Sequence, residues 1–372
     1  MPSQVLHLLF GEDVIEEIYR RIHPRFGIVA DKALEKISAA YKTSFALGCQ
    51  GPDLFYHSQQ TRPVALEYGT LLHRRAYGVF TAALLKMALP NPPPTEEDVR
   101  MQRRENAINA LGAYALGFMT HAFLDRMTHP YIVYKSGWVS PSKPETVRYA
   151  KAHAFFERII DVLMLKYLRE TSISSWDQEA ILVSVCDEPP PGLKELLAKA
   201  LKAVFPERAG KDGKLTLRIE NAFRDAAGFY RFTNPVKTSL HHRYADSNDY
   251  LWGEHRGPLA YLYPEYLSLD IDYLNLARKS WRYPAGLGRE ENRSFPEIYH
   301  DAVMSAADKL TECMSRYLAT GLFPIKEAAQ SIGNSGLSIQ DEEGKPCAPV
   351  FSDPLPLDDV LEQQRNIRLS RL

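Results

Sequence analysis

The sequence predicts an all-α fold, a single bundle of many helices built around one long central helix. Apolar residues recur with a period near 3.6 over most of the 372 residues, which is the spacing of one face of an α-helix. The alternation of Val, Ile, Thr and aromatic residues that marks β-strands is nearly absent. The composition, 45% hydrophobic and 24% charged, is typical of a globular protein with an extensive core.

The first three helices are delimited by recognisable stop signals. The first is expected over residues 10 to 22, and the second over residues 31 to 47, where Gly48 ends it. The third is expected from 64 to 88, because the sequence PNPPP then breaks the chain.

The central helix is expected to begin at Thr95. Thr95 and Asp98 look like an N-cap with its reciprocal acid, and the helical pattern persists to about His129, where Pro130 should end it. Such a helix is roughly 50 Å long, so it should cross the middle of the domain.

The remainder of the chain is expected to hold a loop, further helices and a tail. Residues 131 to 145 have a loop composition, and the next helix carries His153 and Glu157. Other helices are expected over residues 176 to 186, 191 to 205, 215 to 230, 258 to 276 and 295 to 320. From residue 328 the composition is polar and turn-rich, so we expect one helical domain over residues 1 to 327 and a tail over residues 328 to 372.

Charge, terminal sequence and cysteine spacing argue against several classes of protein and of binding site. With 45 basic and 46 acidic residues the formal net charge is -1, so no stable nucleic-acid binding is expected. The first residues, MPSQVLHLLFGEDV, do not form a secretory signal, and no apolar run approaches the roughly 18 residues that span a bilayer. We therefore expect a cytoplasmic protein without a transmembrane segment. The four cysteines lack the C-x-x-C spacing of a thiolate zinc site, and the sequence leaves the oligomeric state open.

A row of polar residues lies in the sequence THAFLDRMTHPY. His121, Asp125 and His129 recur at four-residue steps, so on a helix they form one stripe. Ala113 and Gly117 continue this row backwards. These small residues are expected to leave room beside the helix for something compact.

A second pair of the same kind follows on the next helix. His153 and Glu157 are four residues apart, and Asp161 extends their row by one turn. Imidazole and carboxylate groups are the usual ligands of zinc and similar ions, so two such pairs on neighbouring helices can enclose a metal cluster. Each pair alone is more often a hydrogen bond or an exposed charge pair. The spacing alone leaves both interpretations open. Three more histidines lie upstream: His7, His57 and His73.

Three motifs together resemble the zinc-dependent phospholipase C family, especially a bacterial branch of it. They are LGCQGPDLFYH at 47 to 57, H-x-x-x-D-x-x-x-H-P-Y at 121 to 131 and H-x-x-x-E-x-x-x-D at 153 to 161. The sequences DYLNLARKSW and SFPEIYHDAV are also similar to that branch, and the resemblance covers most of residues 1 to 320. It implies an all-α phospholipase C-like bundle with a metal cleft, and a zinc-dependent hydrolase of phosphate esters. Two or three zinc ions are the implied cofactor, and the implied substrate is a phosphate ester such as a phospholipid.

The resemblance also implies a role for each residue of the motifs. The first metal site would be formed by Asp53, His73, His121 and Asp125, of which Asp125 would also bridge towards a second ion. The second site would be formed by His129, His153 and Glu157. The third would contain His7, with Pro2 or His57 as further candidate ligands. Asp53 is either a ligand or the catalytic base that orients the attacking water, and Asp161 would orient an imidazole.

Two departures from the family pattern bear on these roles. The gap between Asp125 and His129 is shorter than in the secreted enzymes of the family, and no Trp precedes His7, although the secreted enzymes begin with one. The related single-strand-specific nucleases use the same metal cluster, so the resemblance leaves a zinc-dependent nuclease or nucleotide phosphatase as an alternative. A non-catalytic helical protein stabilised by metal is another. A di-iron site at Glu297 and His300 is disfavoured, because that chemistry needs two E-x-x-H pairs.

Overall fold

The computed structural model describes residues 4–89, 108–238, 258–286 and 288–370. Within these ranges the protein is built almost entirely of helices, and its one sheet pairs β1 (Trp281–Arg282) with β2 (Glu290–Glu291) antiparallel. The all-α prediction is confirmed. The longer helices are α1 (Gln4–Phe26), α2 (Ile28–Glu35), α3 (Lys42–Cys49), α5 (Leu66–Arg74), α6 (Tyr77–Ala88), α7 (Ala110–Ser136), α8 (Ala152–Arg169), α10 (Leu193–Val204), α11 (Leu215–Phe232), α14 (Phe295–Thr320), α15 (Ile325–Ile332) and α16 (Leu357–Leu369).

Shorter elements connect the long helices. The single-turn helices are α4 (Asp53–Tyr56), α9 (Ser184–Asp187) and α12 (Pro235–Thr238). There are 3-10 turns at Pro144–Tyr149, Ile173–Ser175 and Pro258–Tyr261, and π-helical turns at Lys36–Ala40 and Glu179–Val183. No helix in the described ranges is both long and apolar enough to cross a membrane.

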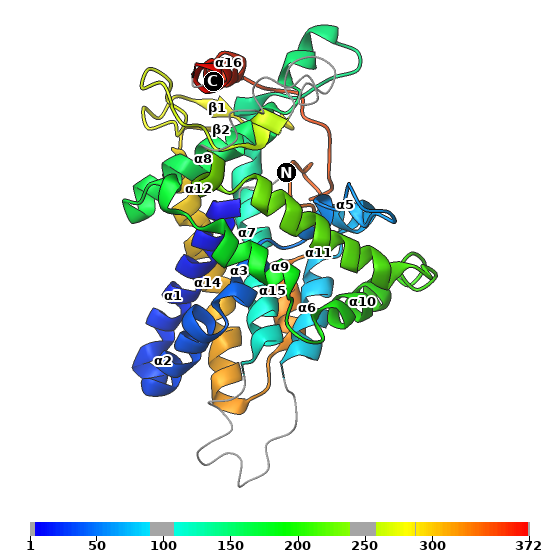
Figure 1. Ribbon diagram of the computed structural model, residues 1–372. Coiled ribbons are helices and arrows are strands. Elements are labelled where there is room, and N and C mark those ends of the chain that lie inside the picture. The colour runs from blue at the N-terminus through cyan, green and yellow to red at the C-terminus, as the bar shows by residue number, and fades with distance from the viewer. Residues whose placement is uncertain (1–3, 90–107, 239–257, 287, 371–372) are drawn as a thin grey trace.

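The central helix of the bundle is α7. It packs against α1, α3, α6, α8 and α14 (Figure 1), and every residue from Gly112 to Asp125 is buried. A helix that is buried on all sides has no polar face, so the polar side chains that it carries must be satisfied inside the protein.

The bounds of α7 differ from the prediction at both ends. The helix begins at Ala110 and not before it, because the side chain of Asn109 caps it by accepting a hydrogen bond from the Gly112 N–H at 2.8 Å. The expected start at Thr95 lies outside the described residues. At its other end the helix continues through Pro130 to Ser136. Proline removes one N–H donor, but the next turn is buried, and the Tyr131 hydroxyl donates to the Tyr273 carbonyl at 2.8 Å.

Two other segments that we expected to be continuous helices are divided into shorter elements in the structure. Residues 31 to 47 form α2, a π-helical turn and α3, and residues 64 to 88 form α5 and α6, which meet at Ala76 in the left-handed conformation (φ 61°). The helix expected over 258 to 276 is wrong beyond Tyr261. Pro264 interrupts the pattern, and the Asp272 carboxylate accepts hydrogen bonds from backbone N–H groups further along the chain, which offers the backbone an alternative to a helix.

Helices α3 and α7 approach each other closely at two glycines. A Cβ atom on Gly117 would lie 2.3 Å from the Phe45 carbonyl oxygen, and one on Gly48 would lie 2.1 Å from the Tyr114 carbonyl oxygen. The room that we expected beside Gly117 is therefore filled by α3 and not by a ligand. This contact brings the loop that follows α3 against the polar stripe of α7.

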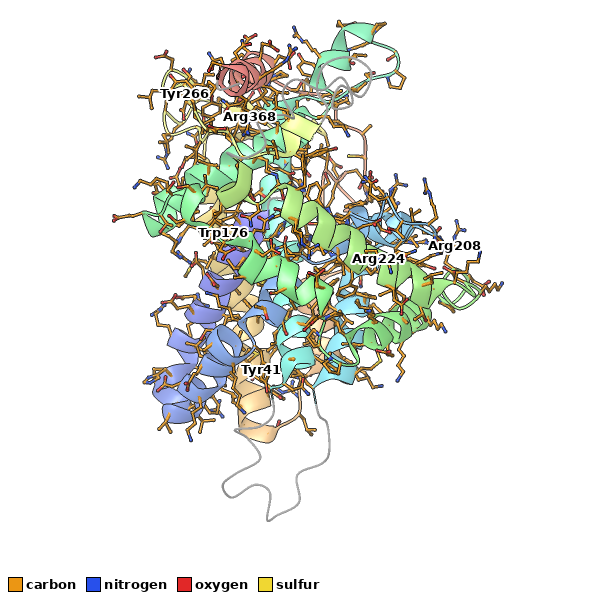
Figure 2. All side chains as sticks on the ribbon, in the orientation of Figure 1. Tyr41, Trp176, Arg208, Arg224, Tyr266 and Arg368 are labelled. Carbon is orange, nitrogen blue, oxygen red and sulfur yellow. The ribbon has the colours of Figure 1, made fainter. Side chains whose placement is uncertain are left out.

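The carboxyl-terminal part of the chain wraps around the bundle. The expected division after residue 327 falls inside α15, which packs on α6, and α16 packs on α8 and on the turn Pro258–Tyr261. At this end, where Figure 2 labels Arg368 of α16, the buried Arg368 guanidinium donates a hydrogen bond to the Tyr263 carbonyl at 3.4 Å. We call the connecting residues 333–356 the strap. Its Asp353 and Leu355 N–H groups donate to the carbonyls of Tyr134 and Lys135 at the end of α7.

Candidate metal centre

Five helices bring the predicted polar residues to one place. The contributing helices are α1, α4, α5, α7 and α8. Helix α7 carries three of the residues, α8 carries two, and each of the other helices carries one. The residues brought together are His7, Asp53, His73, His121, Asp125, His129, His153 and Glu157.

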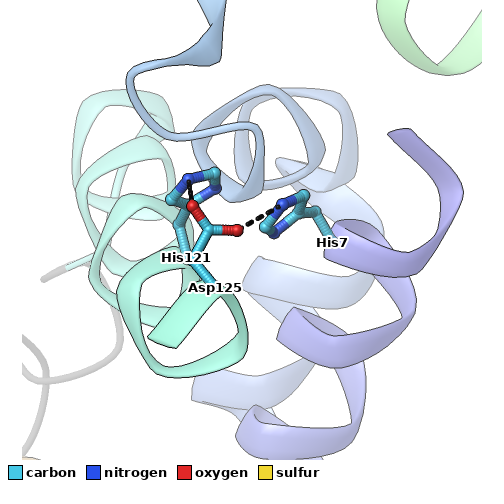
Figure 3. Close-up of side chains that lie close together, drawn as sticks. All are labelled: His7, His121 and Asp125. Carbon is cyan, nitrogen blue, oxygen red and sulfur yellow. Dashed lines mark ion pairs between the residues drawn. The ribbon is translucent and has the colours of Figure 1, made fainter. Parts of the chain in front are cut away.

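Asp125 lies between four histidines. Its Oδ1 is 3.2 Å from Nε2 of His7 and 3.7 Å from Nδ1 of His129, and its Oδ2 is 3.0 Å from Nε2 of His121 and 3.8 Å from Nε2 of His73. Figure 3 shows the carboxylate between His7 and His121. One carboxylate therefore links side chains from three helices.

Asp53 faces three of the same histidines from the start of α4. Its Oδ1 is 3.0 Å from Nε2 of His73, and its Oδ2 is 3.7 Å from Nε2 of His121 and 4.0 Å from Nε2 of His7. The donor atoms of Asp53, His73 and His121 lie within 4.8 Å of one another, as do those of His7, His121 and Asp125. These two groups share His121.

A third group lies between α7 and α8. Oε1 of Glu157 is 3.1 Å from Nε2 of His153 and 3.6 Å from Nε2 of His129, and the two imidazole rings are stacked with centroids 5.5 Å apart. The 3.7 Å approach of His129 to Asp125 connects this group to the other two. Each group has the mixed nitrogen and oxygen donors that zinc accepts.

Backbone carbonyls fix the orientation of three imidazoles. Nδ1 of His73 lies 2.8 Å from the Gly69 carbonyl oxygen, Nδ1 of His121 lies 3.1 Å from that of Cys49, and Nδ1 of His129 lies 2.9 Å from that of Leu337. A carbonyl can only accept, so Nδ1 must carry the proton in each ring. In the neutral ring the lone pair is then on Nε2, which faces the carboxylates, as in histidines that bind metal.

The loop before α4 requires glycine at residue 51. Gly51 has φ of 55°, and a Cβ atom there would lie 2.4 Å from Cγ of His121. Only glycine combines this conformation with so close an approach. The loop can therefore bring both the Cys49 carbonyl and the Asp53 carboxylate against His121.

The buried charges shift one another's pKa. Burial alone would raise the pKa of Asp53 and Asp125, but the neighbouring histidines outweigh it and hold both below the usual range. Burial would lower the pKa of His121 and His129, but the carboxylates raise both, that of His129 to about 9. For His7, burial and the nearby His121 lower the pKa. The cluster therefore favours ionised carboxylates.

Several donor atoms fit a cation. His121 Nε2, Asp53 Oδ2 and Asp125 Oδ2 are buried and have no hydrogen-bond partner among the described residues. Nε2 of His121 and Oδ2 of Asp125 nevertheless lie 3.0 Å apart. Two lone pairs that face each other so closely need a proton or a positive ion between them. The donor set is thus chemically suited to divalent metal.

Three further candidates have other surroundings. His57 is only 5% exposed and stacks on Phe229 with ring centroids 4.4 Å apart, and it belongs to none of the three groups. Burial lowers its pKa to about 3. Asp161 accepts hydrogen bonds from the N–H groups of Gln4, Val5 and Leu6 at 2.8 to 3.3 Å, so it holds the start of the helix that carries His7. Pro2 lies outside the described residues. Glu297, which belongs to the disfavoured di-iron pair, forms the N-terminal capping box of α14 with Ser294.

The spacing of histidine and carboxylate residues in the sequence could not predict which backbone carbonyls contact the histidines. The carbonyls of Gly69, Cys49 and Leu337 contact the histidines, but a carbonyl is present at every position and leaves no signature in the sequence. Gly51 is the exception, because it stands in the quoted motif LGCQGPDLFYH.

A cleft of about 640 Å³ borders the centre. Asp53, His73, His129 and His153 contribute to its lining. Apolar side chains from the end of α7, the loop after it and the strap also line it, namely Val133, Trp138, Val139, Tyr149, Ile339, Pro346 and Pro349. The same cleft contains Gln59, Arg74 and Lys151.

Comparison with known families identifies one match. A family model described as zinc dependent phospholipase C matches residues 7–210. This range includes every residue of the three groups, whereas α14, α15, the strap and α16 lie outside it. Searches among curated proteins and among solved structures found no match.

Proposed function

The chain belongs to the zinc-dependent phospholipase C family, and from this premise we propose that it hydrolyses phosphate esters as a phospholipase C-like phosphodiesterase with two or three zinc ions. One observation carries the proposal. Histidine and carboxylate groups from five helices meet in three connected groups beside a single cleft.

We assign the ligands by group. Asp53, His73 and His121 would hold one ion, and His129, His153 and Glu157 another, while His7 and Asp125 would contribute to a third. When bound, zinc supplies Lewis-acid chemistry, since it makes water nucleophilic at neutral pH and offsets the charge that develops on a phosphate. Asp125 would serve more than one ion, because its two oxygens face different histidines.

Asp53 has two candidate roles, ligand and general base. Its pKa is lowered because the nearby histidines outweigh the effect of burial, so it is a weak proton acceptor at neutral pH. This favours the ligand role. As a base it would orient water from the start of α4, where it lines the cleft.

The cleft supports an amphiphilic substrate. Apolar side chains such as Trp138 and Ile339 can contact an acyl chain or another apolar group, while Arg74 and Lys151 can attract the negative phosphate. A phospholipid combines both features. The aromatic residues Tyr56, Trp138 and Tyr149 could equally stack on a base, which keeps a nuclease or nucleotide phosphatase as the second candidate.

Metal analysis followed by a substrate panel tests the proposal. Zinc per chain would be measured by plasma mass spectrometry for the wild type, for a His121→Ala, Glu157→Ala variant, and for His300→Ala as a control at an exposed position. We expect two or three equivalents in the wild type and the control, and fewer in the double variant. Turnover would then be compared on phosphatidylcholine vesicles, a nucleotide and single-stranded DNA.

The outcomes separate the candidate functions. Hydrolysis of the vesicles supports the phospholipase C-like activity, and cleavage of DNA or the nucleotide alone supports the second candidate. Full zinc without turnover on any substrate supports the non-catalytic protein stabilised by metal. A wild type that stays well below one equivalent after zinc is supplied would contradict all three.

A further inference from the structure

We propose that Arg126 is a positioning residue, which fixes the start of the strap so that the backbone of Leu337 holds His73 and His129 in place. The inference rests on the proposed function, in which both histidines bind zinc. It adds a part of the site that lies outside the residues matched by the family.

Arg126 binds a segment that has no regular structure. It follows Asp125 on α7, and its half-buried guanidinium donates hydrogen bonds to the carbonyls of four residues: Ile332, Gly333, Ser335 and Gly336. The distances to Gly333, Ser335 and Gly336 are 3.2, 3.1 and 3.2 Å. One side chain therefore supplies hydrogen-bond donors to a backbone carbonyl at the end of α15 and to three carbonyls of the turn that follows it.

Leu337, the next residue of the strap, contacts both histidines through its backbone. Its N–H donates to the His73 carbonyl oxygen at 2.9 Å, and its carbonyl oxygen lies 2.9 Å from Nδ1 of His129. The Leu337 side chain is fully buried. A displacement of Leu337 would thus affect a residue from each of two metal groups at once.

The choice of arginine has a chemical reason. A guanidinium has five N–H donors in a fixed plane, whereas a lysine ammonium has three on a flexible stem. Only arginine can reach four carbonyls of one turn together. From the side of α6, the Gly78 N–H donates to the Gly333 carbonyl and the Val79 N–H to the Asn334 side chain, but neither touches Ser335 or Gly336, which lead directly to Leu337.

Loss of the guanidinium should therefore act on the metal centre. With the turn released, Nδ1 of His129 loses a fixed acceptor, and the ring can rotate away from Glu157. Loss of such a supporting hydrogen bond lowers metal affinity by about 10- to 100-fold. The strap also lines the cleft through Ile339 and Pro346, so KM for the substrate should rise as well.

The test compares Arg126→Met, Arg126→Lys and Asp353→Ala. Met keeps the length of the side chain and removes every donor, and Lys keeps the charge. Asp353 pairs with Lys135 at the other end of the strap and is 67% exposed, so Asp353→Ala is a matched control. Zinc affinity would be measured by competition with a chelator, with circular dichroism as a check of folding.

We expect Arg126→Met to bind one equivalent of zinc about 10- to 100-fold more weakly, Arg126→Lys to be intermediate, and Asp353→Ala to match the wild type. After cobalt substitution, the visible spectrum of the affected site should change in Arg126→Met only. A folded Arg126→Met with wild-type affinity and spectrum would overturn the inference. If Arg126→Met does not fold, wild-type affinity in Arg126→Lys would overturn it.

The same experiment separates this inference from the function on which it rests. A wild type that binds no zinc would overturn both. A zinc-binding wild type with unaffected Arg126 variants would overturn the role of Arg126 alone.

Discussion

Nδ1 of His129 lies 2.9 Å from the carbonyl oxygen of Leu337, although 208 positions separate the two residues in the chain. His129 belongs to the motif H-x-x-x-D-x-x-x-H, which the family model matches, and Leu337 belongs to the strap, which it does not. The metal centre thus combines a segment shared with the family and a segment outside the match. Variants on either side should affect the same site.

Replacement of Asp53 by Asn should lower zinc content and turnover together. The carboxylate lies 3.0 Å from His73 and keeps its charge at neutral pH, so it should act mainly as a ligand. Plasma mass spectrometry and initial rates would be measured on one preparation, with Asp308→Asn, which is 68% exposed, as the control. Full zinc content with lost turnover would instead assign Asp53 as the base.

Replacement of Gly51 by Ala should destabilise the protein and displace His121. The new Cβ would lie 2.4 Å from the imidazole, and φ is 55°, so the cost should exceed about 1 kcal/mol of unfolding free energy. Urea unfolding would measure it. Gly213→Ala is the control, because no atom lies within 4 Å of a Cβ at that position. Equal stability of the two variants would contradict the close approach.

Zinc affinity should increase with pH through the titration of His129. The pKa of this imidazole in the zinc-free protein is raised to about 9, because Asp125 and Glu157 outweigh the effect of burial. Zinc therefore competes with a proton below pH 9, and this residue contributes about tenfold in affinity per pH unit between pH 7 and 9. Calorimetry in buffers of different ionisation enthalpy counts the protons released. His129→Gln should release about one fewer, and an unchanged count would refute the assignment.

Acid should destabilise the zinc-free protein partly through His57. Burial lowers its pKa to about 3, whereas the unfolded chain titrates near 6.5. Between these values the unfolded state binds the extra proton, so stability is present above pH 6.5 and is lost as the pH falls. The slope from this group is about 1.4 kcal/mol per pH unit.

His57→Phe removes this titration and keeps a ring that can stack on Phe229. Its unfolding free energy, measured in urea between pH 4 and 6.5, should therefore depend less steeply on pH than that of the wild type. Parallel curves for the two proteins would show that His57 is not buried in its neutral form.

The sequence predicted the positions of side chains best where polar residues recur at regular steps along one helix. Four-residue steps placed His121, Asp125 and His129 on one face, and the structure brings them to the same side of α7. Helix ends were less predictable. Burial of Tyr131 carries α7 past Pro130, and Asn109 starts the helix later than the periodicity indicated. In both cases tertiary or capping contacts override the local pattern.

The supporting part of the site depends on contacts that are distant in sequence. Arg126 could have been an exposed charge on its helix, since nothing near it in the chain indicates that it meets the turn after α15. The polar composition of the strap likewise suggested a segment that buries little. It is ordered through its backbone, which donates to and accepts from α7, and composition does not report on such bonds.

The position of Leu337 late in the chain sets an order of assembly during translation. A ribosome that adds about 5 to 20 residues per second needs roughly 10 to 40 s to proceed from His129 to Leu337. From the addition of Glu157 onwards, the nascent polypeptide already has every side chain of the three groups, but His129 still lacks its carbonyl acceptor. Metal captured early would be held by a ring that can still turn, and maturation of the centre would finish only when the strap docks.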